Sequence, residues 1–312
     1  MRLLKPKFWD KKHYSFFSVL FYPLTYFLDL HEFITATFIK KKKISNIKTI
    51  CVGNIYIGGT GKTPLTEFLA NYLNKKIKTV IIKKKYNQHL DEKKFLEKKN
   101  KVMFYKSRIN ALRIAVKNKF KVAVFDDGLQ DKYIDFDLKI VCFSSYTLIG
   151  NKLRLPAGPL REKISNLKNY QGVVINGRNN FYKKKFINEV RKINPKLKIF
   201  NSEYKPINLK SLIKNKYLVF SGIGNPQSFI NTLRDYKINN SMNFIFPDHY
   251  QFRDVDIERI KHKAKIEKLK ILTTEKDFSR LKAKQRKDID FLKINLKIKE
   301  KKKFIEFLHN YI

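Results

Sequence analysis

The pattern of apolar and polar positions along the chain predicts an α/β protein. Short runs of β-branched and aromatic residues alternate with stretches whose apolar positions recur at helical spacing. This alternation is typical of parallel sheets that are built from βαβ units. We predict a first series of strands at 49–52, 79–82, 122–125, 139–143 and 173–176. A second series is predicted at 217–220, 243–246, 270–273 and 291–294.

The two series of strands predict two domains. The length of 312 residues suits two domains of about 100–200 residues, each able to bury its own core. We place the boundary in the segment 201–206, which separates the two series. Residues 1–204 are predicted to form the first domain, and residues 205–312 a smaller second α/β domain. No Gly or Pro follows Pro247, which favours a helix-rich end of the chain.

A strongly apolar and aromatic segment, 14–28, precedes both series. Because basic residues precede this segment, it resembles a signal peptide. Pro23 interrupts the apolar run, however, and acidic residues follow at the position where a cleavage site is expected. At about 15 residues it is also shorter than the roughly 20 that a membrane span needs. We expect an N-terminal amphipathic helix at the membrane interface, with aromatic side chains among the lipid headgroups. The alternative is a helix that packs on the protein's own core.

The composition is strongly basic, with 68 Lys and Arg against 27 Asp and Glu and a formal net charge of +41. Lys, Ile, Asn and Phe are all over-used, which the codons of an AT-rich genome would produce by themselves. The functional interpretation is attraction to an anionic partner, either nucleic acid or a lipid surface. The two cysteines, Cys51 and Cys142, fall in predicted buried strands, which excludes a disulfide framework and suits a reducing compartment.

Glycine gives the first chemical signal, because four of only 11 glycines fall between Gly53 and Gly61. The segment GNIYIGGTGKTP, residues 53–64, follows a predicted strand and opens a predicted helix, which is the context of a P-loop. Its glycines let backbone N–H groups surround phosphate oxygens at a helix N-terminus. Tyr56 stands where the strict pattern has Gly, and a Gly-rich turn without nucleotide is the alternative. We predict that nucleotide binds to Gly58, Gly59, Thr60, Gly61, Lys62 and Thr63. Lys62 is predicted to contact the β- and γ-phosphates and to act in catalysis by neutralising the charge that develops on the transferred phosphate.

A pair of carboxylates follows a second buried strand. The strand predicted at 122–125 runs into Asp126-Asp127-Gly128, an arrangement typical of a Walker B motif that binds Mg²⁺. We predict Thr63, Asp126 and Asp127 as the magnesium-binding residues. The alternative is an ordinary Asp-Asp-Gly turn. Together with the glycine loop, the pair predicts a P-loop phosphotransferase or nucleotide hydrolase, and it leaves the phosphate acceptor open.

Six motifs in a fixed order carry a family resemblance. They are GGTGKTP at 58–64, DDGLQ at 126–130, LPAGPLRE at 155–162, GIGNPQSF at 222–229, FPDHYQF at 246–252 and TTEKD at 273–277. Together they resemble the tetraacyldisaccharide 4'-kinases, the ATP-dependent lipid A kinases of Gram-negative bacteria. The resemblance implies two α/β/α domains, with ATP and sugar meeting in the cleft between them. It also implies ATP and Mg²⁺ as cofactors, and transfer of phosphate to the 4'-hydroxyl of a tetraacylated glucosamine disaccharide 1-phosphate.

The resemblance implies roles for single residues near the nucleotide and the sugar. Asp126 and Asp127 match the family's acidic pair at the metal, and Gln130 matches the polar residue beside it. Arg161 and Glu162 end the LPAGPLRE motif, which lies close to the active site in the family. A further match is Arg108, which we predict to lie near the substrate.

The resemblance also implies a catalytic base that a histidine supports. His249 matches that histidine, and the base belongs in the family's GDEP segment, where this chain has Leu90-Asp91-Glu92-Lys93. We therefore predict Asp91 as the base, since a carboxylate paired with a His suits removal of a proton from a sugar hydroxyl. The alternatives are a solvated acid at Asp91 and a turn or capping histidine at His249.

Two departures from the family's pattern concern the site. The family has SRGYGG where this chain has Lys83-Lys84-Lys85-Tyr86-Asn87, which retains Tyr86 as a predicted substrate residue and loses the glycines. The family also follows DDGxQ with His, where this chain has Asp131.

The resemblance implies an enzyme on the cytoplasmic face of the inner membrane, peripheral or monotopic, whose partners are the glycolipid substrate and the membrane surface. We expect a monomer without a nucleic-acid partner. One rival interpretation is a membrane-associated P-loop ATPase that acts as a switch or recruiting module, for which LPAGPLRE and FPDH have no explanation. The other is a nucleic-acid-binding protein, which would interleave aromatic and basic residues on an exposed platform. The aromatic residues here fall mainly in apolar runs instead.

Overall fold

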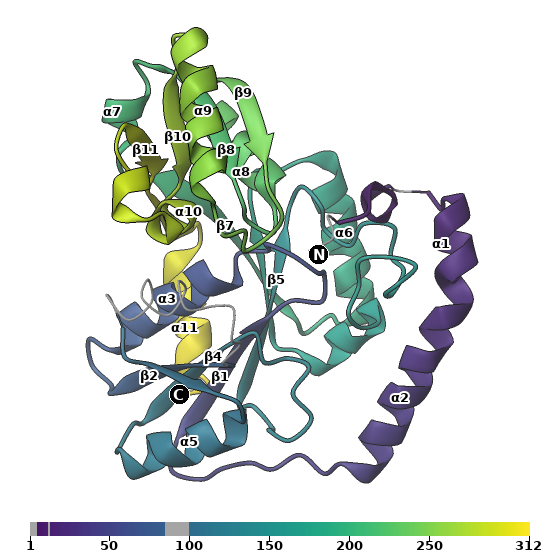
Figure 1. The fold of residues 1–312 in the computed structure, drawn as a ribbon. Helices are drawn as coiled ribbons and strands as arrows, with labels where there is room; N and C mark the ends of the chain where they lie inside the picture. Colours follow the sequence, from purple (N-terminus) through teal and green to yellow (C-terminus); the bar gives the residue numbers. More distant parts are fainter. Residues whose placement is uncertain (1–4, 12, 85–99) are drawn as a thin grey trace. The chain divides into compact units, whose positions relative to one another are not determined.

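The computed structural model describes residues 5–11, 13–84 and 100–312. The described chain divides into two compact units (Figure 1). The larger unit contains the described residues between 5 and 84, together with 100–203 and 297–312. The smaller unit contains residues 204–296. Residues 297–312, which the division predicted from sequence placed in the C-terminal domain, therefore belong to the larger unit.

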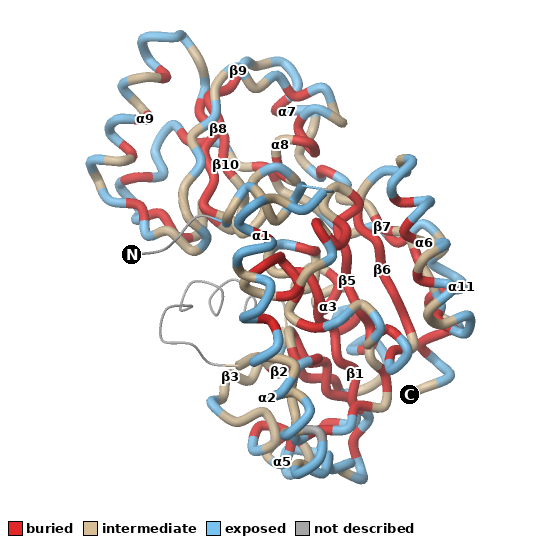
Figure 2. The backbone as a smooth tube through the Cα atoms, turned by 90° about the vertical axis from the view of Figure 1, so that its right-hand side faces the viewer, coloured by how far each residue is buried: buried red, intermediate tan, exposed pale blue. Residues whose placement is uncertain are grey.

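The described residues of the larger unit are built on an eight-stranded sheet with the order β12-β7-β6-β5-β1-β4-β2-β3, whose strands β7 and β12 continue past the division into residues 204–206 and 294–296. The pairs from β7 through to β3 are parallel. Its strands are β1 Lys48–Gly53, β2 Thr79–Lys84, β3 Val102–Tyr105, β4 Val122–Asp126, β5 Leu138–Ser144, β6 Gly172–Asn176, β7 Lys198–Pro206 and β12 Ile294–Ile298. The central strands are almost wholly buried (Figure 2). Because they are buried on both faces, they read as continuous apolar runs in the sequence.

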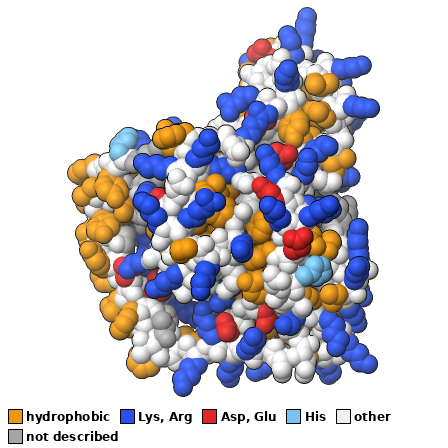
Figure 3. All heavy atoms as spheres, turned by 180° about the vertical axis from the view of Figure 1, so that it is seen from behind, with side chains coloured by type: hydrophobic (Ala, Val, Ile, Leu, Met, Phe, Trp, Pro, Cys, Tyr) orange, Lys and Arg blue, Asp and Glu red, His pale blue; other side chains and the backbone are white. Residues whose placement is uncertain are grey.

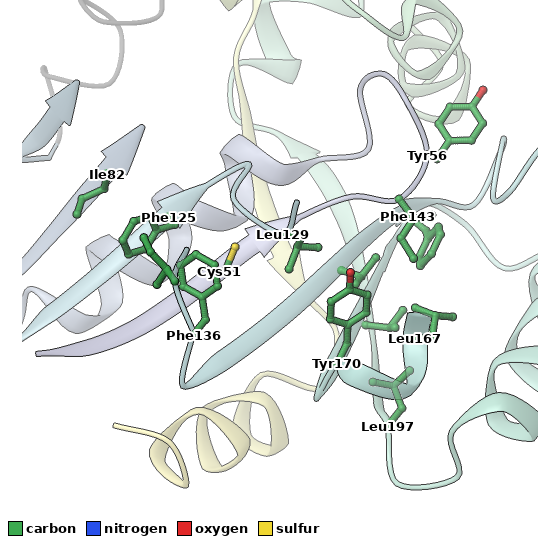
Figure 4. Packing of buried hydrophobic residues seen from close by; sticks show 14 of the residues in the cluster. Cys51, Tyr56, Ile82, Phe125, Leu129, Phe136, Phe143, Leu167, Tyr170 and Leu197 are labelled. Atoms are coloured by element: carbon green, nitrogen blue, oxygen red, sulfur yellow. The ribbon is translucent and has the colours of Figure 1, made fainter. Parts of the chain in front are cut away.

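Helices and aromatic side chains complete the core of this unit. In the part of the larger unit that the structure describes after β1, the helices are α3 Lys62–Leu73, α5 Arg108–Lys117, α6 Phe181–Ile193 and α11 Lys301–His309, with the 3-10 helix η3 at Ile164–Asn169. Phe125 and Phe136 meet edge to face with ring centroids 4.9 Å apart, close to the buried thiol of Cys51 (Figure 4). Such aromatic pairs favour offset and edge-to-face contacts.

The smaller unit has a four-stranded sheet with the order β11-β10-β8-β9, and all three of its strand pairs are parallel. Its strands are β8 Lys216–Ser221, β9 Asn239–Ile245, β10 Lys270–Thr274 and β11 Ile289–Leu292. Its helices are α7 Leu209–Leu212, α8 Pro226–Asp235, α9 Asp254–Ile266 and α10 Glu275–Arg280, with the 3-10 helix η4 at Ala283–Gln285. Separate apolar clusters include buried residues of α9 in one case and of α7 and α8 in the other.

The predicted strands agree with the structure in all but a few places. The polar segment 201–206, placed as the boundary, contains the division between the units after Glu203, but it is also part of β7, which was missed together with β3. The strand expected at 291–294 overlaps two strands, because β11 ends at Leu292 and β12 begins at Ile294. β7 has no continuous apolar run, which explains why the pattern did not reveal it. The four residues of β3, VMFY, are apolar and half-buried, and they were missed although they form such a run.

Two helices near the N-terminus lie on the outside of the larger unit. The chain forms the 3-10 helix η1 at Lys7–Asp10, then α1 Phe16–Phe21, the 3-10 helix η2 at Tyr22–Leu24, and α2 Thr25–Phe38. Most of their large apolar side chains are exposed, up to 76% for Phe16 and 80% for Phe38, and they form a band on one face of the molecule (Figure 3). Packing on the protein's own core is therefore wrong for this band. Among the described residues, no helix has the length and apolarity that a membrane crossing requires.

The polar side of α2 faces the rest of the larger unit. Asp29 pairs with Arg154 and, at 2.9 Å, with Lys163, and Glu32 lies 2.9 Å from Arg154. Burial acts to raise the pKa of Asp29, but the hydrogen bonds from its two basic partners outweigh burial and lower that pKa. The helix is thus held by its charged side, which leaves the apolar band outward.

Candidate active site

The glycine loop connects β1 to the N-terminus of α3 in the larger unit. Gly58 and Gly61 have φ angles of 113° and 95°, which L side chains rarely adopt, and Gly61 caps the helix that begins at Lys62. The buried amide of Asn54 donates to the carbonyl of Gly58 at 3.1 Å and so holds the loop closed on itself. A strand, a glycine loop and a helix N-terminus occur in the order that phosphate binding requires.

Tyr56, the departure from the strict P-loop pattern, attaches the loop to its surroundings. Its side chain is buried, and its hydroxyl donates to Asp10 and accepts from the Lys5 ammonium at 2.7 Å. Its backbone forms an antiparallel bridge with Leu160 of the LPAGPLRE segment. The tyrosine therefore joins the start of the loop to two other segments of the larger unit.

Asp126 ends β4 beside the loop. The parallel register pairs it with Val52 of β1 on one side and Lys83 of β2 on the other. Its Oδ2 accepts from the Thr63 hydroxyl at 2.9 Å and from the Lys83 ammonium at 2.7 Å. Its Oδ1 is buried and has no hydrogen-bond partner among the residues that the structure describes. Lys83 was not predicted as a site residue, and only the register of β2 against β4 reveals it.

Asp127 has a left-handed φ of 64° and lies among three cations. Its Oδ2 is 3.7 Å from the Lys62 ammonium, its Oδ1 accepts from Arg161 at 2.9 Å, and its carbonyl accepts from Arg108. Burial acts to raise the pKa of Asp127, but the charges of Lys62 and Arg161 outweigh burial and lower it. Burial lowers the pKa of Lys62, and the charge of Asp127 opposes that effect.

Gln130 and Glu162 form a polar connection behind this cluster. The Gln130 amide donates to the carbonyl of Asn54 at 3.1 Å and to Glu162 Oε1 at 2.7 Å. Glu162 Oε2 accepts from Tyr170 at 2.7 Å and from Asn166 at 2.9 Å. The structure thus brings both residues to the loop, where they connect it to the segment after LPAGPLRE.

Arg108 and Asp131 also lie at the cluster. Arg108 begins α5 and is 3.4 Å from Asp131, the residue that replaces the family's histidine. The structure therefore brings together every predicted site residue of the larger unit that it describes. Tyr86 and Asp91, the predicted substrate residue and catalytic base, lie outside the described residues.

Two buried oxygen atoms test whether these residues fit a nucleotide and Mg²⁺. Thr60 Oγ1 and Asp126 Oδ1 are both buried without a partner in the described part of the chain, and buried polar atoms are rarely left in that state. Mg²⁺ is typically held by one or two carboxylates together with phosphate oxygens and water. The hydroxyl of Thr63 and the carboxylates of Asp126 and Asp127 supply such a donor set, so the residues fit the group.

His249 lies in the smaller unit, in the turn after β9. Its φ is 58°, and its N–H donates to the carbonyl of Gly222 at 3.0 Å. Its ring nitrogen Nδ1 is 3.0 Å from a guanidinium nitrogen of Arg280. Arg280 was not predicted as a site residue, although it follows the TTEKD motif by only three positions.

Comparison with known proteins places the chain in a family. A family model described as tetraacyldisaccharide-1-P 4'-kinase matches residues 17–102 and 88–312. A tetraacyldisaccharide 4'-kinase of Pelagibacter ubique is 45% identical over 306 residues, which cover 97% of this chain and 96% of that protein. One of Rickettsia bellii is 31% identical over 308 residues and 90% of each chain.

The fold has a solved counterpart. A crystal structure of LpxK from Aquifex aeolicus in complex with ATP superposes with a TM-score of 0.69 at 21% identity, covering 94% of this chain and 99% of that one. The predicted α/β class, with a parallel sheet and a P-loop, is confirmed. The resemblance carried by the six motifs is confirmed as well, and the chain belongs to the tetraacyldisaccharide-1-P 4'-kinase family.

Proposed function

We propose that the chain transfers the γ-phosphate of ATP to the 4'-hydroxyl of a tetraacylated glucosamine disaccharide 1-phosphate. The observation that carries the chemistry is the 2.9 Å hydrogen bond from Thr63 to Asp126. It joins the phosphate loop to the acidic strand end, the two elements that supply the Mg²⁺-binding residues of P-loop enzymes. The acceptor follows from membership of the family over nearly the whole chain.

The cations of the larger unit have separate tasks in this proposal. Lys62 binds the β- and γ-phosphates, while the backbone of residues 58–61 binds phosphate oxygens at the start of α3. Thr63, Asp126 and Asp127 would hold Mg²⁺, which supplies positive charge against the charge that develops on the transferred phosphoryl group. Arg161 and Arg108, both within reach of Asp127, are placed to bind substrate phosphate or sugar oxygens.

Proton transfer is assigned to a carboxylate and a histidine. Asp91 accepts the proton of the 4'-hydroxyl as that oxygen attacks the γ-phosphorus, and His249 orients the carboxylate. Positioning and electrostatic stabilisation supply most of the acceleration, and no covalent enzyme intermediate is needed.

The apolar band on α1 and α2 is proposed to lie in the headgroup region of the cytoplasmic face of the inner membrane. Exposed aromatic residues on one side of a helix favour such interfacial binding. The net charge of +41 adds attraction to anionic lipid. This placement would bring an acylated substrate to the enzyme without its leaving the bilayer.

The kinase proposal is tested with γ-labelled ATP, Mg²⁺ and the tetraacyl disaccharide 1-phosphate in detergent, followed by chromatography of the lipid. We expect label in the lipid for the wild-type chain, and a large loss for Lys62→Ala through weaker nucleotide binding and slower turnover. Release of labelled phosphate without labelled lipid would refute the acceptor and support the rival ATPase.

The membrane proposal is tested by cosedimentation with vesicles that contain anionic phospholipid. Phe27→Ser and Phe33→Ser remove two side chains that are 69% and 71% exposed, and together they are expected to reduce binding at least tenfold. Phe181→Ser is the matched control, since Phe181 is 72% exposed but lies on α6. Equal binding by all three proteins would contradict the role of the band.

A further inference from the structure

The imidazole of His249 lies within hydrogen-bond distance of a neighbouring arginine. The Arg280 nitrogen Nη2 lies 3.0 Å from His249 Nδ1. A guanidinium carries only N–H donors and stays protonated in proteins, so Nδ1 must be the acceptor of this bond. A neutral imidazole whose Nδ1 accepts carries its hydrogen on Nε2.

Arg280 is itself held rigidly in the interior of the smaller unit. Its other terminal nitrogen, Nη1, is 2.8 Å from Asp277 Oδ1 and 2.8 Å from the carbonyl of Gly222. The side chains of Arg280 and Asp277 are both 0% exposed. Because both charges are buried and paired, the guanidinium has little freedom to turn away from the histidine.

Asp277 is fixed in turn by the start of its own helix. Thr274 caps α10 by accepting from the N–H of Asp277 at 3.0 Å, and its hydroxyl donates to Asp277 Oδ2 at 2.8 Å. The N–H of Gly222 donates to the same oxygen at 3.0 Å. A continuous series of bonds therefore runs from Thr274 through Asp277 and Arg280 to His249.

The backbone around the histidine is fixed by the same glycine. Gly222 accepts from the N–H of His249 and from Arg280 while it donates to Asp277. A Cβ at Gly222 would meet Tyr250 Cβ at 3.2 Å and the Pro247 carbonyl at 3.3 Å, so the turn sits close against this position. The motifs GIGNPQSF, FPDHYQF and TTEKD thus each contribute one hydrogen-bond partner of the Arg280 side chain.

We propose that Arg280, held by Asp277, is a positioning residue that makes His249 a hydrogen-bond donor through Nε2. This inference rests on the proposed function, which gives His249 the task of orienting the catalytic carboxylate. With Nδ1 engaged by a cation and Nε2 already carrying hydrogen, the ring does not take the proton of the sugar hydroxyl. The ring is then suited to donate a hydrogen bond to the proposed base and not to act as the base itself. The nearest acid in sequence, Asp248, lies 3.8 Å from Nε2, beyond hydrogen-bond distance.

The tautomer is measured directly on the full-length protein without substrate. Long-range ¹H–¹⁵N correlation spectra distinguish the two neutral tautomers of imidazole, and the chain has only six histidines. His249→Gln identifies the signal of His249. We expect the Nε2–H tautomer in the wild-type chain, and a predominant Nδ1–H tautomer would overturn the proposal whatever the activity of any variant.

The arginine is tested with Arg280→Lys, which retains a positive charge beside Asp277 but loses the forked geometry that also reaches the histidine. We expect a mixture of tautomers, a kcat about tenfold lower because the carboxylate is less well oriented, and an unchanged KM for ATP. Arg286→Lys is the matched control, since Arg286 donates to the carbonyls of Leu281 and Ser279 at 3.0 and 3.1 Å. It should retain the wild-type tautomer and kcat.

Failure of this inference differs from failure of the proposed function. A variant Arg280→Lys with the wild-type tautomer and wild-type kcat would overturn the role of Arg280 while lipid phosphorylation continues. If Arg280→Lys does not fold, the wild-type spectrum alone still decides the tautomer. A wild-type chain with the Nε2–H tautomer but no lipid phosphorylation would refute the function and with it the catalytic purpose of the pairing.

Discussion

Lys83 provides the sharpest test of how the magnesium site is built. Its ammonium lies 2.7 Å from Asp126 Oδ2, and the two side chains are 11% and 1% exposed. Asp126 is also a proposed ligand of Mg²⁺, so ammonium and metal act on the same carboxylate. We expect Lys83→Ser to bind Mg²⁺ with nucleotide more tightly than the wild-type chain, and to be less stable when Mg²⁺ is absent.

The magnitude follows from the geometry of the pair. At 2.7 Å and an effective dielectric constant of about 20, the Coulomb attraction is roughly 6 kcal/mol. Desolvation of the buried charges offsets much of this, which leaves about 1.5–3 kcal/mol for a charge-assisted hydrogen bond. If metal binding costs the wild-type chain about 1.4 kcal/mol of this Lys83–Asp126 interaction, the Mg²⁺ concentration at half-saturation is about tenfold lower for the variant, which has no such interaction to lose. Without metal, a loss of about 2 kcal/mol lowers the midpoint of unfolding by roughly 4–8 °C.

The assay is a Mg²⁺ titration at fixed nucleotide, read by a fluorescent ATP analogue and by thermal unfolding with and without Mg²⁺. Lys48→Ser is the control, because it makes the same charge change at an exposed position at the start of β1, whereas the glycine loop follows the end of that strand. A Mg²⁺ requirement that is unchanged or higher in Lys83→Ser would refute the reasoning. Lys83 would then act on the nucleotide and not compete with the metal.

Three further predictions concern single carboxylates. Asp91→Asn is expected to lower kcat by at least a hundredfold with little effect on ATP binding, since it removes the proposed base, and single-turnover kinetics would show this. Asp127→Ala is expected to be about 1 kcal/mol less stable to urea than Asp127→Asn, because Ala tolerates a φ of 64° less well than Asn does. Asp29→Asn should cost about 1–2 kcal/mol of unfolding free energy at pH 7, where Asp29 accepts charge-assisted hydrogen bonds. Because the folded-state pKa of Asp29 is lowered, that difference is present above the ordinary pKa of about 4 and disappears as the pH falls through the folded-state value, which urea unfolding at several pH values would measure.

The central strands were predictable because burial on both faces makes them continuous apolar runs. β7 was not, since its burial alternates with exposed and half-buried positions. The absence of Gly and Pro after Pro247 predicted a helix-rich end of the chain, but it did not identify the partner of α11. In the structure Phe304 and Phe307 pack against Phe200 of β7 with centroids 4.9 and 5.2 Å apart, within the larger unit. The spacing of apolar residues predicts which face of a helix is buried, whereas the surface against which that face packs depends on the topology of the fold.

The residues of the candidate site also divide into those that the sequence predicted and those that it did not. The loop at 58–63 and the carboxylates at 126–127 were predictable, because both follow strands whose carboxyl ends meet at one edge of a parallel sheet. Lys83 looked like one member of a lysine run, and it becomes significant only through the register that sets it beside Asp126. Arg280 depends on a turn that brings His249 back to α10, and no local spacing encodes that contact.

The net charge of the chain does not describe the charges at the site, where cations and carboxylates are paired. Asp126 is paired with Lys83, Asp127 with Lys62 and Arg161, and Asp131 with Arg108. The cations proposed to bind substrate, Lys62, Arg161 and Arg108, are therefore already held by carboxylates, which reduces the cost of keeping them buried and ordered. Phosphate must exchange for these partners when it binds, so the net charge of +41 does not by itself measure affinity for nucleotide. Selectivity for a phosphate group over other anions would then arise from geometry, since only a ligand that satisfies several of these donors at once replaces the carboxylates without loss.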